Sequence, residues 1–297
     1  MHTKLVSFLL FARNKKKRNI LPVIFLISIS ILSACGQPAP PATTSTAAVI
    51  PTRIPPTIGS TMIGEDNATL VYVPEGEFAM GSDDKSDEQP IHKVKLNAFW
   101  IDQTEVTNKQ YATCILNGGC TPPSNTSSAM RSSYYGNSEF DEFPVIYVDW
   151  NNANAYCSWA GRELPSEAQW EKAARGTEAF TYPWGDDAPN DTLLNYNQNV
   201  GDTTEVSKFP NGKSIYGADD MAGNVWEWVY DWYQSDYYAK LGDSASNPQG
   251  PASSGNRVLR GGSWDFSISS ARSANRDWVY PTFTYNNVGF RCARSLP

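Results

Sequence analysis

Hydrophobic and polar residues alternate along two segments in the first part of the chain, at positions 69–74 and 92–101. A period of two residues is typical of a strand that buries one of its faces. In the second segment, Val94 and Leu96 alternate with lysines. We therefore expect strands in both segments.

Three helices are predicted by their end signals. Thr107 with Gln110 forms a capping-box pattern at the start of the first helix. The second helix is expected over 151–160, before a glycine, and the third over 167–175, where Gln169 completes a second capping box. Beyond residue 176 the sequence is rich in Gly, Asn, Asp and aromatic residues and has little periodicity. We expect this half to contain loops and short strands, which need disulfides or bound ions to stay ordered.

The N-terminal segment is typical of an export signal. Residues 4–18 carry all six positive charges of the first 34 residues, and an apolar run follows over 20–32. This run is shorter than the roughly 20 residues that a membrane-spanning helix needs. It ends in Leu-Ser-Ala-Cys35, which resembles the lipobox of bacterial lipoproteins. The resemblance implies cleavage after residue 34 and a lipid on Cys35, which would anchor the exported protein to the outer face of a bacterial membrane. The alternative is an ordinary signal peptide followed by a chance cysteine.

Composition separates the remaining chain into two parts. Residues 35–66 are rich in Pro, Thr and Ala, and such a segment buries too little apolar surface to offset the entropy of ordering. We expect a tether there. Residues 67–297 contain all ten tryptophans and no second segment of this kind, which predicts one domain.

Charge excludes two classes of function. The full chain has 24 basic residues, and loss of the six in the signal leaves 18 against 31 acidic residues, a formal charge of −13. An acidic protein has no electrostatic footprint for nucleic acid. Since His92 is the only histidine beyond the signal, a His-rich zinc or iron site is excluded as well.

Four cysteines remain besides the lipobox cysteine, an even number in an exported chain. Cys114 and Cys120 flank a short turn that contains two glycines, which favours a disulfide between them. This pairing leaves Cys157 with Cys292. A bridge that closes so long a loop stabilises by about 4–5 kcal/mol on the chain-entropy model.

Several blocks of sequence resemble the formylglycine-generating enzyme family, also called the sulfatase-modifying factor family. They are Arg-Glu-Leu-Pro-Ser-Glu-Ala-Gln-Trp-Glu at 162–171, Tyr-Gly-Ala-Asp-Asp-Met-Ala-Gly-Asn-Val-Trp-Glu-Trp at 216–228, Arg-Gly-Gly-Ser-Trp at 260–264 and Gly-Phe-Arg-Cys at 289–292. The resemblance covers residues 69–294. It implies an α+β domain related to C-type lectin-like folds, with much irregular backbone, bound calcium, and a bridge between Cys157 and Cys292.

The resemblance also locates a missing pair of catalytic residues. Enzymes of this family use a copper-binding cysteine pair and dioxygen to oxidise a substrate cysteine within Cys-x-Pro-x-Arg to formylglycine. The two positions are Phe266 and Ala271 in this chain. Copper(I) needs soft thiolate ligands, which a phenyl ring and a methyl group do not supply. We therefore expect no copper and a relative without the oxidase activity.

Two calcium sites are implied by the resemblance, and their ligands are oxygen atoms, as calcium prefers. The first would use the Asp220 side chain, the carbonyls of Gly223 and Val225, and the Glu227 carboxylate. The second would start at Asn195 and the Tyr196 carbonyl, with Asp202 as a candidate acidic ligand. A solvated acidic loop is the alternative for the first site.

The family's substrate cleft would lie near Trp226, Ser263, Asp265 and Arg276. We expect an extracytoplasmic domain that binds a peptide, a protein or a saccharide there. Two alternatives remain: an enzyme of altered chemistry in which Ser263, Asp265 and Arg276 act, or a formylglycine-generating oxidase that acts on sulfatase cysteines.

Overall fold

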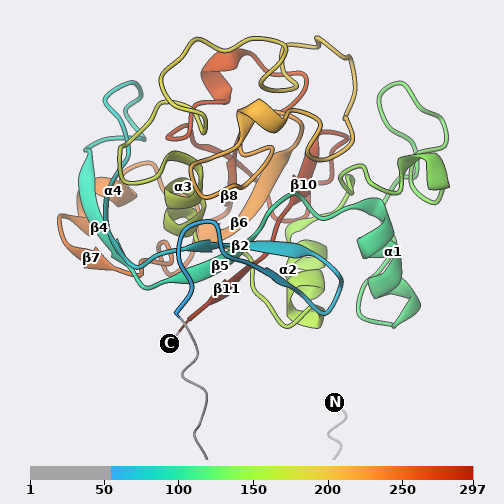
Figure 1. The fold of residues 1–297 in the computed structure, drawn as a ribbon, viewed down its shortest axis with the longest axis horizontal. Coiled ribbons are helices and arrows are strands. Elements are labelled where there is room, and N and C mark those ends of the chain that lie inside the picture. The colour runs from blue at the N-terminus through green and yellow to red at the C-terminus, as the bar shows by residue number, and fades with distance from the viewer. Residues whose placement is uncertain (1–54, 297) are drawn as a thin grey trace, which may run out of the picture. The chain divides into compact units, whose positions relative to one another are not determined.

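The computed structural model describes residues 55–296. The predicted signal peptide, Cys35 and residues 35–54 of the predicted tether lie outside the described residues. Within the described part of the chain, no helix is long and apolar enough to cross a membrane. Figure 1 shows short helices set among short strands and long loops.

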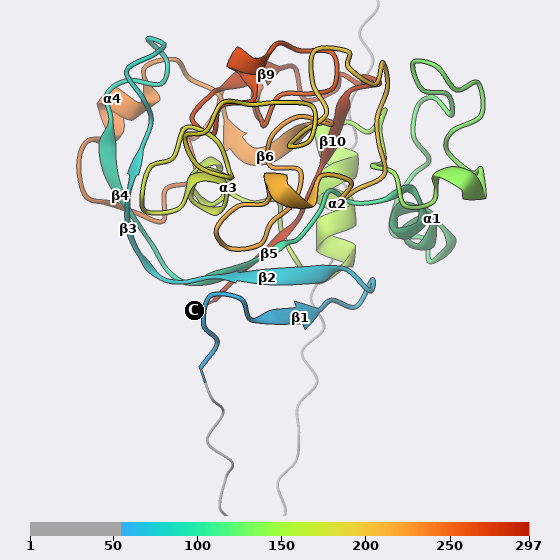
Figure 2. The same ribbon diagram turned by 45° about the horizontal axis from the view of Figure 1, so that its top comes forward.

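The first sheet joins the two ends of the domain. Its strand order is β1-β2-β5-β11, and every pairing is antiparallel. In Figure 2, β1 runs below β2 along the lower edge of the domain. The strands are β1 (Thr61–Ile63), β2 (Thr69–Val73), β5 (Phe99–Asp102) and β11 (Ala293–Ser295).

The second sheet forms the centre of the domain. Its order is β10-β6-β8-β9, with β10 parallel to β6 and the other pairs antiparallel. The strands are β6 (Trp226–Trp232), β8 (Arg257–Arg260), β9 (Asp277–Val279) and β10 (Val288–Phe290). The first four residues of β6 are all buried, because both faces of this strand are covered.

The third sheet contains β3 (Gly76–Met80), β4 (His92–Leu96) and β7 (Ala245–Ser246). The segment 92–101 thus forms two strands, β4 and β5, which belong to different sheets. Lys93 and Lys95 point to solvent while their neighbours in β4 are buried, as the alternation predicts.

The three predicted helices are confirmed: the first starts at its predicted cap, and the other two lie within one residue of their expected bounds. They are α1 (Asn108–Leu116), α2 (Trp150–Trp159) and α3 (Glu167–Arg175). Both capping boxes form, with Thr107 and Ser166 accepting from the backbone N–H three residues on. A fourth helix, α4 (Tyr237–Leu241), and three 3₁₀ turns (Ser138–Phe140, Pro210–Gly212 and Ile268–Ser270) carry no clear signal in the sequence.

The two largest apolar clusters join most of the helices and strands. One core packs α3 against β2 to β5 and includes Trp170, and the other packs α1 and α2 against β6, β8 and β10. The polar face of α3 is also buried, where the Glu171 carboxylate bonds Arg260 at 2.5 Å and Arg175 at 3.1 Å. Buried charges are tolerated when they are paired and fully hydrogen-bonded.

The folded domain begins earlier than residue 67. β1 pairs with β2 over three residues, and Asp66 is 6% exposed. The Asp66 carboxylate pairs with both Nη atoms of Arg162 and accepts from the Tyr156 hydroxyl at 2.5 Å. The predicted boundary between tether and domain is therefore too late, because composition alone does not show that Asp66 has a buried cationic partner.

Both predicted disulfides are present. Cys114 bonds Cys120 across the turn after α1, and Cys157 of α2 bonds Cys292, which lies 135 residues later. The second bridge joins α2 to the segment between β10 and β11.

Candidate functional site

An aromatic and polar cluster lies at the start of β6. The Phe266 ring packs edge-on against the Trp226 ring, with centroids 5.4 Å apart, and remains 38% exposed. Beside it, the Ser263 hydroxyl donates to the Asp265 carboxylate at 2.8 Å, and Asn287 Nδ2 donates to the same oxygen at 3.0 Å. We call these five residues the Phe266 cluster.

A glycine pair places this cluster. Gly261 and Gly262 have φ of 96° and 75°, in the left-handed region that favours glycine. A Cβ on Gly262 would lie 3.0 Å from the backbone of Ser270. The chain therefore turns sharply after β8 and directs Ser263 inward, where it is 1% exposed.

The loop between β9 and β10 borders the cluster and is fixed from several sides. Its backbone oxygens accept from the backbone N–H groups of Trp150, Tyr147 and Trp226. Three aromatic rings of this loop form a stack, with centroids 5.7 and 5.5 Å apart, and are 38–57% exposed: Tyr280, Phe283 and Tyr285. A contiguous group of exposed aromatic rings often marks a binding surface, whereas single exposed rings are common on any protein.

Below the cluster, β6 carries a buried acidic centre. The Glu227 carboxylate accepts from Arg291 through two bonds of 2.7 Å and from Trp170 Nε1 at 2.9 Å. Burial, together with the nearby Asp219 and Glu227, raises the pKa of Asp220 to about 6. The three carboxylates of Asp219, Asp220 and Glu227 thus outnumber their two cationic neighbours, since Arg291 pairs with Glu227 and Lys213 lies 3.3 Å from Asp219.

Glu105 belongs to this centre, although the sequence did not single it out as a site residue. It is fully buried, and Oε1 accepts from Asn224 at 3.0 Å while Oε2 has no partner. Burial and the charge of Asp220 raise its pKa well above the ordinary value. The sequence held a signal, because Glu105 opens the segment Glu-Val-Thr-Asn at 105–108, which lies within the region of resemblance, residues 69–294.

With this geometry in place, comparison with known proteins identifies the family. The Sulfatase-modifying factor enzyme 1-like domain matches residues 60–296. The chain belongs to this family. A formylglycine-generating enzyme of Streptomyces coelicolor is 33% identical over 281 residues, which covers 75% of this chain and 88% of that protein. The structure of PvdO from Pseudomonas aeruginosa has 26% identity and a TM-score of 0.68, and covers 82% of this chain and all of that one. The predicted α+β fold of the sulfatase-modifying factor family is thus confirmed.

A further relative is much longer than this chain. Serine/threonine-protein kinase pkn1 of Chlamydia pneumoniae is 36% identical over 239 residues, which covers 76% of this chain and 38% of that protein. The chain thus spans well under half of this chlamydial relative. The similarity shows a shared domain of the sulfatase-modifying factor family, and the kinase activity is not inferred for this chain.

The structure separates the residues expected in the family's substrate cleft. Trp226, Ser263 and Asp265 lie together in the Phe266 cluster. Arg276 is 3% exposed and is committed elsewhere, because its Nε and Nη2 donate to the Glu167 carboxylate at 2.7 and 2.9 Å. This ion pair leaves Arg276 no role in an altered chemistry with Ser263 and Asp265.

The two positions predicted for the family's catalytic cysteines differ in their surroundings. Phe266 lies at the surface, whereas Ala271 is 2% exposed and packs with Leu194 and Ala222. Within residues 55–296 every cysteine is in a disulfide, so this part of the chain has no free thiol.

The residues expected at the second calcium site are only partly suited to it. Asn195 Oδ1 is buried and has no partner, whereas the Tyr196 carbonyl accepts from the Asn199 backbone. The Asp202 carboxylate is already saturated, since it accepts from Ser128, Met130 and Thr203 and pairs with Arg131 at 3.0 Å. This geometry favours a structural ion pair for Asp202, and the second calcium site stays a prediction.

Proposed function

We propose that this protein is an exported, lipid-anchored member of the sulfatase-modifying factor family that lacks oxidase activity and binds a ligand at the Phe266 cluster. One observation carries the proposal: every cysteine of residues 55–296 is held in a disulfide, and the resemblance predicts the catalytic thiols at Phe266 and Ala271, which have none. Copper(I) chemistry at this place would need thiolates.

The missing oxidase activity is tested with a Cys-x-Pro-x-Arg peptide, copper and dioxygen, followed by mass spectrometry of the peptide. The natural chain is expected to leave the cysteine unchanged, and any aldehyde product would overturn the proposal. The double variant Phe266→Cys, Ala271→Cys then asks whether only the thiols are missing. Product from the double variant alone would support the idea of an intact scaffold.

Ligand binding is supported by the exposed aromatic rings and the polar groups beside them. A peptide, a protein or a saccharide would find apolar ring faces on Phe266 and hydrogen-bonding groups on Asp265 and Asn287. A ligand that binds only the folded state raises the melting temperature. We therefore expect peptides, amino acids or cell-wall saccharides to raise it, and Phe266→Ala to abolish the shift.

The matched control for this experiment is Trp278→Ala, which removes an exposed ring in β9 outside the cluster. Trp278 is 44% exposed and stacks on Tyr233. A shift that survives Phe266→Ala but disappears in Trp278→Ala would place the ligand elsewhere. If no class of compound gives a shift, the ligand-binding proposal fails for these classes and a protein partner becomes the next candidate.

We also propose calcium at the first site. The donors that remain are hard oxygen atoms: the Asp220 carboxylate and the carbonyls of Gly223 and Val225. The Glu227 carboxylate, also expected as a ligand, is already held by Arg291 and Trp170. Glu105 adds a buried carboxylate oxygen without a partner, which fits a cation bound nearby. The described residues offer no group of three His, Cys, Asp or Glu side chains for a metal, so the carbonyl oxygens would be essential.

Calcium is tested by chelation and by Asp220→Ala, each followed by thermal unfolding. A bound ion stabilises in proportion to the logarithm of its concentration, so calcium is expected to raise the melting temperature by several degrees. An unchanged melting curve after verified metal removal would contradict the site.

Lipid anchoring is tested separately on the full chain. Metabolic labelling with a radioactive fatty acid is expected to mark the natural protein and not Cys35→Ser, which would appear in the soluble fraction. Equal labelling of both proteins would disprove a lipid on Cys35.

A further inference from the structure

A polar groove lies at the other end of β6 from the Phe266 cluster. It consists of three adjoining cavities with volumes of about 250, 130 and 210 Å³. Gln249 lines all three, and Tyr230 is shared by the first two. Each is smaller than a typical ligand pocket of roughly 300–1,000 Å³, so a ligand would have to occupy more than one. We call the three together the Gln249 groove.

The first cavity contains a buried cation without an anion. Arg257 is 7% exposed, and its guanidinium lies between the rings of Trp150 and Trp232, 3.6 Å from each centroid. Nη1 donates to the Tyr230 carbonyl, and the buried Nε has no partner. Among the described residues Arg257 forms no ion pair, unlike the buried arginines at 162, 260, 276 and 291.

The nearest acid does not compensate this charge. Asp231 is buried, and burial with the nearby Glu167 raises its pKa to about 8. It is therefore mainly neutral at pH 7. Burial also lowers the pKa of Arg257 to about 10, because the nearby Tyr230 and Asp231 offset only part of the effect of lost water. Buried charges in proteins are normally paired, so the missing anion at Arg257 points to a ligand.

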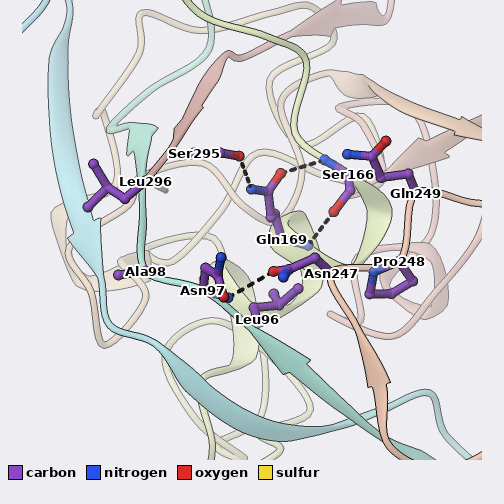
Figure 3. A pocket seen from close by; sticks show the side chains of 10 residues that line it. All are labelled: Leu96, Asn97, Ala98, Ser166, Gln169, Asn247, Pro248, Gln249, Ser295 and Leu296. Carbon is purple, nitrogen blue, oxygen red and sulfur yellow. Dashed lines mark hydrogen bonds between the residues drawn. The ribbon is translucent and has the colours of Figure 1, made fainter.

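Apart from Glu163 in the second cavity, the rest of the groove is neutral and rich in hydrogen-bonding groups. Figure 3 shows the third cavity, in which the Gln169 amide bonds Ser166 and Ser295, and Asn247 accepts from the Asn97 backbone at 2.8 Å. The side chains of Asn97, Asn247 and Gln249 are exposed there. Tyr230, 40% exposed, adds an aromatic surface next to the cation.

This combination of groups selects one class of ligand. Amides and hydroxyls pair with sugar hydroxyls, an exposed aromatic face packs against a sugar ring, and a guanidinium binds a carboxylate. A polyphosphate or nucleic acid is disfavoured, because Arg257 is accompanied by Glu163 in the groove and the chain is acidic overall. We propose that the Gln249 groove binds a saccharide that carries a carboxylate, with the carboxylate at Arg257 and a sugar ring on Tyr230.

This site is separate from the Phe266 cluster. Trp226 begins β6 and Trp232 ends it, and six residues of strand span roughly 20 Å. The two proposals therefore fail or succeed independently.

The test uses the full chain, with α-1,4-linked trigalacturonate as the acidic probe and the corresponding neutral trigalactose as its match. Binding is followed by isothermal titration calorimetry and by tryptophan fluorescence, to which Trp150 and Trp232 contribute among the ten tryptophans. We expect the acidic trisaccharide to bind at least about tenfold more tightly than the neutral one, and added salt to weaken binding. Equal binding of the two, or no binding of either in the millimolar range, would overturn the proposal.

Variants then locate the site. Tyr230→Ala and Gln249→Ala alter exposed side chains with little risk to folding, and Tyr230→Ala is expected to weaken binding about tenfold, or about 1.4 kcal/mol. Arg257→Lys retains the charge but loses the planar fork, so it should weaken binding in a chain with natural circular dichroism. Tyr280→Ala, which removes an exposed ring outside the groove, is the control. Unchanged affinity in Tyr230→Ala and Arg257→Lys would refute the assignment.

A titration with peptides tests whether the carboxylate could instead be the C-terminus of a peptide. Trialanine and its C-terminal amide are titrated under the same conditions. Weak binding of both supports the saccharide assignment. If trialanine binds more tightly than trigalacturonate, and its amide does not bind, the groove recognises a peptide C-terminus and the proposal is wrong.

Discussion

Asp231 gives a sharp test of how this domain handles buried charge. The carboxyl group is 2% exposed in β6, and one of its oxygens accepts from the Glu167 backbone N–H at 2.8 Å at the start of α3. Burial is the main cause of its raised pKa, about 8 in the folded chain, and the negative charge of Glu167 adds to it. The protonated carboxyl and an amide have the same shape and similar hydrogen-bonding groups. Asp231→Asn is therefore the informative change.

The sign and the magnitude follow from proton linkage. Below pH 4 both states hold the proton, and above pH 8 both have released it. Between these values the folded chain binds a proton that the unfolded chain has lost, so the contribution of Asp231 to stability falls by about 1.4 kcal/mol for each pH unit. The amide that replaces the carboxyl group in the variant has no such proton. From pH 5 to pH 7, the free energy of unfolding of the variant should therefore rise by about 3 kcal/mol relative to that of the natural chain.

The assay is urea unfolding, followed by tryptophan fluorescence, at several pH values from 5 to 9. Other buried acids, such as Asp102 with a pKa of about 7, titrate in both proteins and cancel in the difference. Asp236→Asn, whose side chain is 57% exposed beside Lys240, is the control and should show a difference that does not change with pH. The reasoning would be refuted if the free energy of unfolding of Asp231→Asn minus that of the natural chain stayed constant, or fell, as the pH rises.

Two further predictions concern the staples and the helix ends. Replacing Cys157 and Cys292 by alanine should lower the free energy of unfolding by about 5 kcal/mol, because the bridge closes a loop of 135 residues. The same change at Cys114 and Cys120 should lower it by about 2 kcal/mol, because that loop spans 6 residues. Denaturant titration under oxidising conditions measures both losses, and equal losses would contradict the loop-length argument. Thr107→Ala should lower the free energy of unfolding by about 1 kcal/mol, because the Thr107 hydroxyl caps α1, while Thr107→Ser should lower it little. The same denaturant titration measures both variants. A similar loss in both would show that the cap is not responsible.

The sequence by itself determined the features that depend on neighbours in the chain. Two helices start where Thr107 and Ser166 complete capping boxes, because a cap needs only the next three residues. The turn between Cys114 and Cys120 is equally local. The family could also be assigned, because its blocks are continuous stretches of sequence in a fixed order.

The tertiary structure decided the features that join distant segments. Asp66 belongs to the fold because Arg162 lies across from it, and Arg276 leaves the expected cleft because Glu167, 109 residues away, neutralises it. The composition near either residue does not reveal its partner. Arg257 is a similar case, since Trp150 and Trp232 enclose it only after α2, β6 and β8 have packed. Caps and turns depend on residues that are neighbours in the chain, so they could be predicted from the sequence. Burial and the pairing of charges depend on which distant segments meet, so only the tertiary structure shows them.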